Sequence, residues 1–148
     1  MPDSFEIRLR PATLADTERL LAWRNDPETQ QQSKIPGEVF MPEHTAWLHK
    51  TLDDPRIRLR IALLGDTPVG SVRANADGAG WILSWTVSPA ARGRNVGYRM
   101  VARMIDELSG TVRADIKPEN LASIKIAEKL GMRQAEDENG MTVWVLNC

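Results

Sequence analysis

The first pattern in the chain is an alternation of apolar and charged residues over residues 5–10, FEIRLR. Such alternation is typical of a strand with one buried face, and Pro11 is expected to end it. Thr13 and Asp16 then have the three-residue spacing of a helix capping pair. The helix that follows is expected to close at Pro27, and its apolar residues are Leu20, Leu21 and Trp23.

A second helix is predicted over residues 42–54, because Pro42 suits a first helical turn and apolar residues recur at helical spacing. The residues that share one face of this helix are His44, Trp47, Leu48 and Thr51. His49 points elsewhere. The preceding segment, residues 28–40, is polar and contains a proline followed by a glycine, so it is expected to be a loop.

Three strands are predicted in the middle of the chain, over residues 57–64, 68–75 and 81–88. Each is rich in apolar residues, and the turn sequences GDTP and NADGAG separate them. Short turns between consecutive strands favour antiparallel pairing. We therefore expect an antiparallel meander.

Helices and strands alternate in the last third of the chain. One helix is predicted from its apolar stripe, which consists of Val96, Met100, Val101, Met104, Ile105 and Leu108. A fifth strand is expected over residues 111–117, a helix over residues 119–131 that Gly131 ends, and a last strand over residues 141–147. A meander followed by this alternation predicts an α/β (α+β) fold, a mixed sheet with helices on both faces.

Composition places the chain among ordinary globular domains. Its 148 residues fit a single domain, residues 1–148, and are 42% hydrophobic and 26% charged. The net charge of -1 gives no reason to expect a nucleic-acid or membrane partner. The single cysteine, Cys148, can form no disulfide within the chain. Without a signal-peptide pattern or a run of about 18 apolar residues, a cytoplasmic location is expected.

Candidate chemistry is concentrated in residues 87–100, VSPAARGRNVGYRM, where a strand passes into a helix. Gly93 and Gly97 allow successive backbone N–H groups to face one small space at the helix amino terminus. Arg92 and Arg94 add full positive charge there, so the segment suits a phosphate or pyrophosphate. The alternative is a basic surface turn that only caps the helix. Neither G-x-G-x-x-G nor G-K-[S/T] is present.

Two ordered motifs resemble those of the GNAT family of acetyl-CoA-dependent N-acetyltransferases. The segment RGRNVG, residues 92–97, is similar to the family signature [Q/R]-x-x-G-x-[G/A], with Asn95 in place of the middle glycine. Asparagine tolerates left-handed backbone well, so the turn is expected to survive. The segment PENLASIKIAEKLGM, residues 118–132, resembles the later motif N-x-x-[S/A]-x-x-x-x-E-K-x-G-F, with Met132 for the aromatic residue.

The resemblance covers the whole chain and implies the family fold, a mixed sheet of about six or seven strands that is split between strands four and five. It implies that acetyl-CoA lies in the split, with the backbone of Thr86 and Val87 on the pantetheine arm and amides of residues 93–98 on the pyrophosphate. The cofactor-binding residues that it implies are Thr86, Val87, Arg92, Gly93, Arg94, Asn95, Val96, Gly97, Tyr98 and Asn120. No metal is implied.

The catalytic residues are less clear than the cofactor site. Acetylation of an amine needs a general base or a water chain to deprotonate it, and an acid can protonate the leaving thiolate. Family members carry a glutamate on strand four or five and a tyrosine in the later helix, but this chain has Ala127 at the tyrosine position. On strand four, Ile82, Ser84 and Thr86 occupy the face where a carboxylate is expected.

Three residues remain as catalytic candidates. Asp115 aligns with a glutamate of some relatives, although an ion-paired strand surface with Arg113 and Lys117 is the alternative. His44 is a candidate base beside Trp47, or a packing residue. Ser123 is a candidate proton donor, or a serine that bonds its own helix.

The acceptor is expected between the first two helices. The sequence WRNDPE, residues 23–28, resembles the subgroup that acetylates nucleotide-linked amino sugars, and also the ribosomal-protein N-terminal and antibiotic-resistance subgroups. Arg24, Asn25 and Trp47 are the candidate substrate-binding residues, although Arg24 and Asp26 can instead pair locally.

The function that follows is transfer of an acetyl group to a primary amine of a small molecule by direct attack in a ternary complex, with a nucleotide-linked amino sugar as the favoured acceptor. The alternatives are an N-terminal acetyltransferase of a protein or peptide, a non-catalytic acyl-CoA sensor, and an unrelated binding module. The chain is expected to be a monomer or a homodimer.

Overall fold

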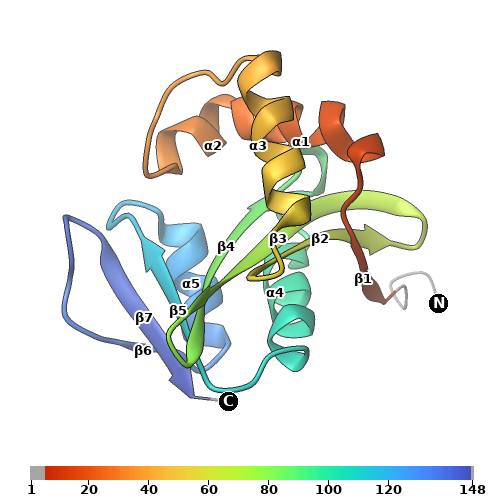
Figure 1. Cartoon of the computed structure of the whole chain (residues 1–148). Helices are drawn as coiled ribbons and strands as arrows, with labels where there is room; N and C mark the ends of the chain where they lie inside the picture. Colours follow the sequence, from red (N-terminus) through yellow and green to blue (C-terminus); the bar gives the residue numbers. More distant parts are fainter. Residues whose placement is uncertain (1–5, 148) are drawn as a thin grey trace.

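Seven strands form one mixed sheet in the computed structural model, which describes residues 6–147 (Figure 1). The strands are β1 (Ile7–Pro11), β2 (Ile57–Leu64), β3 (Thr67–Asp77), β4 (Gly80–Val87), β5 (Thr111–Ile116), β6 (Arg133–Gln134) and β7 (Thr142–Asn147). Their order across the sheet is β1-β2-β3-β4-β5-β7-β6. Every pair is antiparallel except β4–β5, which is parallel. The predicted meander and mixed sheet are confirmed, while Phe5 and Cys148 lie outside the described residues.

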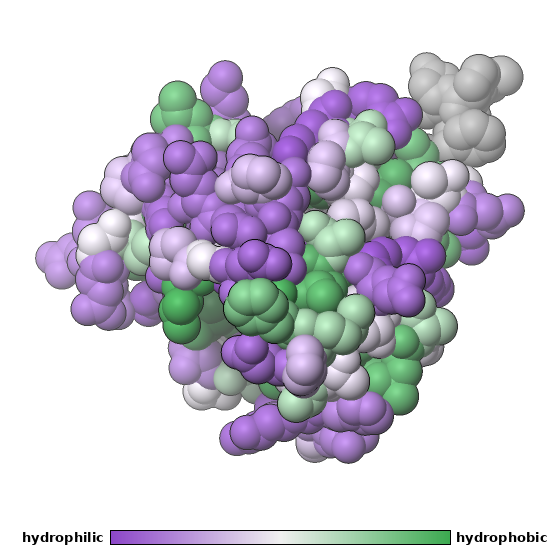
Figure 2. Space-filling view, turned by 90° about the horizontal axis from the view of Figure 1, so that it is seen from above, coloured by the Kyte–Doolittle hydropathy of each residue, from purple (hydrophilic) through white to green (hydrophobic). Residues whose placement is uncertain are grey.

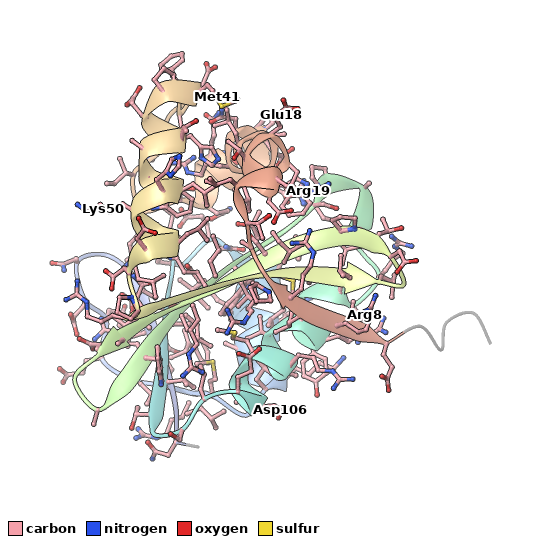
Figure 3. The ribbon with its side chains drawn as sticks, turned by 45° about the vertical axis from the view of Figure 1, so that its right-hand side comes forward. Arg8, Glu18, Arg19, Met41, Lys50 and Asp106 are labelled. Atoms are coloured by element: carbon pink, nitrogen blue, oxygen red, sulfur yellow. The ribbon has the colours of Figure 1, made fainter. Side chains whose placement is uncertain are left out.

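Helices cover both faces of the sheet, as predicted. On one face lie α1 (Thr17–Asn25), α2 (Pro27–Gln32) and α3 (Met41–Asp53), and on the other lie α4 (Val96–Asp106) and α5 (Leu121–Lys129). Figure 3 shows this division, with the labelled Met41 and Lys50 on α3 and Asp106 on α4 at opposite sides of the sheet. No helix within residues 6–147 combines the length and the apolar character needed to cross a bilayer.

Each face of the sheet has its own hydrophobic cluster. The larger cluster buries the predicted stripe of α4, and Met100, Val101 and Met104 are fully enclosed against the sheet. The smaller cluster joins Leu20 of α1 and Leu48 of α3 to β2. The acceptor-side helices therefore rest on a separate and smaller core than α4 and α5.

Two short elements were missed by the sequence patterns. Residues 27–32 form α2 instead of loop, because the Asp26 side chain accepts a hydrogen bond from the Thr29 N–H and Pro27 occupies the first turn. Pro27 thus follows the end of α1, as predicted, and also begins α2. Strand β6 has only two residues, which is too short to produce an alternating pattern.

The first helix begins at the predicted capping pair. The Thr13 hydroxyl accepts a hydrogen bond from the Ala15 N–H, and the Asp16 carboxylate accepts one from the Thr13 N–H. A single 3-10 turn, Leu14–Asp16, stands between this cap and α1. The cap fixes the point at which the chain turns from β1 into the acceptor-side helices.

The sheet opens between β4 and β5. Only residues 81–83 of β4 pair with β5, where they face residues 112–114. Beyond this point the strands diverge, and residues 84–87 keep their β3 partners without a partner in β5. The predicted split between strands four and five is confirmed.

Candidate active site

A cleft of about 960 Å³ occupies the opening between β4 and β5. Its walls are residues 82–87 of β4, the turn and first residues of α4, the end of β5, the start of α5, and parts of α1 and α2. Figure 2 shows that hydrophilic side chains cover most of the molecular face on which α1, α2 and α3 lie. The strands contribute both apolar residues, such as Ile82 and Val87, and polar residues, such as Ser84 and Arg73, to the cleft wall.

The backbone of β4 presents a free strand edge to this cleft. The Ser88 N–H donates to the Val69 carbonyl at 2.8 Å, and the Thr86 carbonyl approaches Gly70, so even-numbered residues bond toward β3. Because successive residues of a strand point their N–H and C=O groups to opposite sides, those of Trp85 and Val87 face the β5 side. These groups suit an extended ligand that lies along the strand.

The turn before α4 has the backbone that the glycine-rich segment predicts. Gly93 has a φ of 82° and Asn95 a φ of 61°, so both adopt left-handed conformations. The Asn95 side chain makes no capping bond to the helix, and its Oδ1 instead accepts a hydrogen bond from the Lys129 ammonium at 3.0 Å. The expectation that asparagine preserves this turn is confirmed. The first amides of α4 therefore stay available at its positive end.

Gly97 stands where the start of α4 packs closely on its neighbours. A Cβ added there would lie 2.5 Å from Ile126 Cδ1 and 3.3 Å from Val87 Cγ2. The absence of a side chain lets the start of α4 approach both α5 and β4, and these elements are neighbours of the cleft. Tyr98 follows it on the cleft wall, with the Lys129 ammonium 4.4 Å from its ring centroid.

The two arginines of the turn have different surroundings. Arg92 forms ion pairs with Asp26 at 2.6 Å and Glu28 at 3.3 Å, so its side chain joins the turn to α2. The Arg92 hydrogen bond is the largest cause that lowers the pKa of Asp26. Arg94 is exposed and is not among the residues that line the cleft. The turn therefore offers its backbone amides to the cleft more directly than its guanidinium groups.

Asn120 and Ser123 lie together at the start of α5. The Asn120 Oδ1 accepts the Ser123 N–H at 3.2 Å and caps the helix. The Ser123 hydroxyl oxygen accepts the Trp85 indole N–H at 3.2 Å. The hydrogen-bond partner of Ser123 is thus a side chain of β4. Ser123 lines the cleft, and Ala127 follows it one turn later on the same face of α5.

Asp115 lines the cleft but is held by two cations. Its carboxylate accepts hydrogen bonds from Arg113 Nε at 2.6 Å and from Lys34 Nζ at 3.0 Å. Burial raises the pKa of Asp115, but these hydrogen bonds outweigh burial, so its pKa lies below the usual range. Of the ion-paired strand surface that the sequence offered as an alternative, Asp115 and Arg113 form a pair. Lys117 does not join it, because its ammonium donates to the Gln31 carbonyl.

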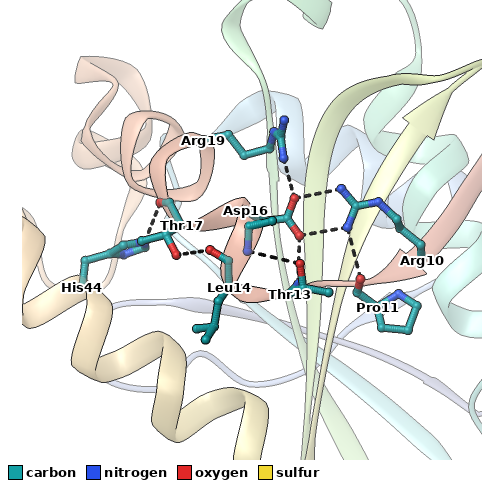
Figure 4. Close-up of polar contacts among 9 residues, drawn as sticks. Arg10, Pro11, Thr13, Leu14, Asp16, Thr17, Arg19 and His44 are labelled. Atoms are coloured by element: carbon teal, nitrogen blue, oxygen red, sulfur yellow. Dashed lines mark hydrogen bonds and ion pairs between the residues drawn. The ribbon is translucent and has the colours of Figure 1, made fainter.

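His44 is a residue of α3 whose side chain faces α1, and it is not among the residues that line the cleft. It is buried, stacks on Trp47 with ring centroids 5.6 Å apart, and its Nε2 lies 3.0 Å from the Thr17 carbonyl oxygen (Figure 4). Burial lowers the pKa of His44, although the bond to Thr17 partly opposes this shift. His44 is therefore placed as a packing residue, the alternative to a catalytic base.

The three candidate substrate-binding residues are not brought together in the cleft. Arg24 lines it, and the Arg24 guanidinium donates to the carbonyls of Ile35 and Gly37. Asn25 does not line it, because its side-chain amide is bonded to both the N–H and the carbonyl of Val39. Trp47 is also outside the lining, and its exposed fraction is 37%.

Arg73 is the functional candidate that sequence analysis missed. Its side chain lines the cleft from β3, directly opposite Ser84 on β4. The available signal was its place in PVGSVRAN, where Ser71, Arg73 and Asn75 alternate with small or apolar residues inside a central strand. A charged residue at such a position is expected to have a partner or a ligand.

No group of three or more His, Cys, Asp or Glu residues within the described part of the chain has an arrangement that could hold a metal ion. The cleft instead combines a free strand edge, helix amides and a serine hydroxyl. These groups suit an extended, anionic ligand.

Comparison with known proteins agrees with this geometry. The family model for the acetyltransferase (GNAT) domain matches residues 6–133. A domain from Methanocaldococcus jannaschii is 23% identical, with a TM-score of 0.85 and coverage of 97% of this chain and 99% of that one. A ribosomal-protein-alanine N-acetyltransferase from Brucella melitensis is 21% identical, with a TM-score of 0.79 and coverage of 95% and 99%.

An aminoglycoside acetyltransferase solved with coenzyme A is also similar, at 19% identity, a TM-score of 0.80 and coverage of 96% and 95%. At these identities the solved structures show a shared fold. No curated protein matches the chain by sequence. The family match covers most of the chain, so the alternative of an unrelated binding module is wrong.

Proposed function

Because the chain belongs to the GNAT acetyltransferase family, we propose that it moves the acetyl group of acetyl-CoA to a primary amine of a small molecule within a ternary complex. The chain is an acetyl-CoA-dependent N-acetyltransferase, and the proposal concerns the acceptor and the residues. One observation carries it: the unpaired edge of β4 at residues 84–87 leads into the left-handed turn and amino terminus of α4.

The cofactor site in this proposal rests mainly on backbone groups. The N–H and C=O groups of Trp85 and Val87 hold the pantetheine arm, because those of Thr86 are directed to β3. The amides of residues 93–98 hold the pyrophosphate at the amino terminus of α4. Asn120 contributes from the start of α5, while Arg92 acts through the ion pair that joins the turn to α2.

The thioester of bound acetyl-CoA supplies an acyl carbon that the acceptor nitrogen attacks, with cleavage of the carbon–sulfur bond. In this proposal Ser123 donates its hydroxyl proton to the leaving sulfur and regains a proton from the attacking nitrogen, which loses one N–H as the amide forms. The Ser123 oxygen accepts the Trp85 indole N–H, which leaves the hydroxyl hydrogen free to be donated into the cleft. It stands on the helix face where relatives carry a tyrosine, at Ala127 here.

The acceptor ammonium loses its proton to solvent in the open cleft. Asp115 is a weak base because Arg113 and Lys34 stabilise its ionised form. In this proposal Asp115 does not take the proton but holds Lys34 in place. His44 acts by packing α3 against α1, since it lies outside the cleft lining. Most of the rate acceleration then comes from holding amine and thioester together.

The direct test measures release of free CoA thiol from acetyl-CoA with a panel of amines. The panel contains nucleotide-linked amino sugars, amino-terminal peptides, polyamines, aminoglycosides and amino acids. Release that depends on one class supports the proposal, and release only with peptides would instead assign an N-terminal acetyltransferase. Binding of acetyl-CoA without release across the panel would favour the sensor alternative, and no binding would overturn the proposal.

A further inference from the structure

Arg73 stands at the junction between the acceptor-side helices and the split in the sheet. In the register of the sheet it lies opposite Ser84 of β4 on one side and Leu59 of β2 on the other. Gly70, on the opposite face of β3, approaches Met100 of α4, so Arg73 points to the face covered by α1 and α3. Its guanidinium is therefore placed beside the reacting end of the split, away from the α4 turn.

The Arg73 guanidinium has no counterion within residues 6–147. The Arg73 Nε is buried and makes no hydrogen bond, and the Arg73 Cζ lies over the Trp47 ring, 5.8 Å from its centroid. Burial lowers the pKa of Arg73, and no hydrogen bond or charge opposes this effect. The Arg73 side chain is partly buried, but its Nε is shielded from water without a partner, and such a group is unfavourable unless a ligand supplies the partner.

The other charges around the cleft do not neutralise Arg73. Lys34 is paired with Asp115, and Arg92 with Asp26 and Glu28. Two more cations, Arg24 and Lys117, are bonded to backbone carbonyls. The acceptor side of the cleft therefore has an excess of positive charge that its own carboxylates do not balance.

Gln32 supplies a second unmatched group in the same cleft. Its Oε1 is buried without a hydrogen-bond partner among the described residues, and Gln32 lines the same cleft from α2. It is a hydrogen-bond acceptor, whereas Arg73 is a donor. A molecule that carries both an anionic oxygen group and an N–H or O–H donor satisfies the two together.

We propose that the acceptor is an anionic amine, whose carboxylate or phosphate oxygens pair with Arg73 while a donor group of the same molecule bonds to Gln32 Oε1. This inference rests on the proposed acetyl transfer and adds the chemical class of its acceptor. The planar guanidinium suits either oxyanion, because both accept two parallel hydrogen bonds. Polycationic amines such as aminoglycosides are poor acceptors, because Arg73 repels them.

The test uses two matched pairs of amines that differ in their anionic group. Glucosamine 6-phosphate is compared with glucosamine, and β-alanine with β-alaninamide. Binding of each amine to the CoA-loaded protein is measured by calorimetry, and acetylation by thiol release. The proteins are the wild type, Arg73→Gln, Arg73→Lys and a matched control, Arg56→Gln, whose side chain is exposed and pairs with Asp54 outside the cleft.

The wild type is expected to bind the anionic member of one pair about 10- to 100-fold more tightly than the neutral member. The phosphate pair and the carboxylate pair distinguish the two oxyanions. Arg73→Gln is expected to remove this preference and leave neutral amines unaffected, Arg73→Lys to keep part of it, and Arg56→Gln to keep all of it. Acetyl-CoA affinity is expected to be the same in all four proteins.

Equal binding of both members of both pairs by the wild type, including no binding of any, overturns the inference. So does an equal loss for anionic and neutral amines in Arg73→Gln, or a loss of acetyl-CoA affinity, because Arg73 would then serve another purpose. Failure of the proposed function looks different. In that case the anionic amines bind with the stated preference while no thiol is released.

Discussion

Replacement of Asp16 by asparagine is expected to destabilise the protein in a pH-dependent way. The Asp16 side chain is fully buried where β1 meets α1, and its carboxylate is surrounded by donors (Figure 4). Arg10 donates to both of its oxygens at 2.8 Å, the Thr13 N–H donates at 2.9 Å, and Arg19 forms a further ion pair. Asparagine keeps the shape of this side chain and removes its charge.

The magnitude follows from the pKa of Asp16. Burial alone raises this pKa, but the hydrogen bonds from Arg10, Thr13 and Arg19 prevail and lower it from 3.8 to about 2. At 1.36 kcal/mol per pKa unit, the ionised carboxylate contributes about 2 kcal/mol to the free energy of unfolding at neutral pH. Arg10 and Arg19 are 36% and 38% exposed, so water can solvate them when the carboxylate is lost.

The sign of the pH dependence is set by the lowered pKa. The contribution is complete above the unfolded-state value near 3.8 and is lost as the pH falls toward 2. At pH 3 about half of it is already gone. The difference between wild type and Asp16→Asn is therefore about 2 kcal/mol at pH 7 and roughly half of that at pH 3.

Urea denaturation at pH 7, 4 and 3 measures this difference. The matched control is Asp66→Asn, which removes the carboxylate of an ion pair to Arg8 that is fully exposed, and no measurable change is expected. A difference that stays constant from pH 7 to pH 3 would refute the electrostatic account. So would a loss in Asp16→Asn no larger than that in the control.

Three further substitutions test the cleft. Gly97→Val is expected to weaken acetyl-CoA binding about tenfold by calorimetry, because its side chain would displace the end of Ile126 and crowd Val87, both of which line the cleft; unchanged affinity would contradict the packing argument. Ser123→Ala is expected to lower kcat about 100-fold with an unchanged KM for acetyl-CoA, whereas an unchanged kcat would exclude Ser123 as the proton donor. Arg73→Met is expected to raise the free energy of unfolding of the ligand-free protein by about 1 kcal/mol in urea, since it removes a partly buried charge whose Nε has no hydrogen-bond partner. A loss of stability there would mean that Arg73 is satisfied without a ligand.

Local sequence patterns predicted the elements because each pattern has a direct local cause. Alternation produced the strands, and the stripe on α4 became the fully buried face of that helix. The pattern failed at α2, where Pro27 has two roles that the sequence does not distinguish, ending one helix and opening the next. The left-handed turn at Asn95 was predictable for the same local reason, since it depends on one residue's own backbone preference.

Side-chain roles in the cleft were decided only by the tertiary structure. The sequence offered the pairing of Asp115 with Arg113, but only the fold brings Lys34 to Asp115 from a segment 81 positions earlier in the chain. His44 was removed from the cleft by its packing between two helices, and Arg73 entered it because β3 and β4 place it opposite Ser84. Except for α2 and β6, the elements, their order and the phosphate-type turn were predictable from the sequence, since these depend on neighbours in the chain. The charge balance of the cleft depends on residues that are distant in sequence, and only the fold brings them together.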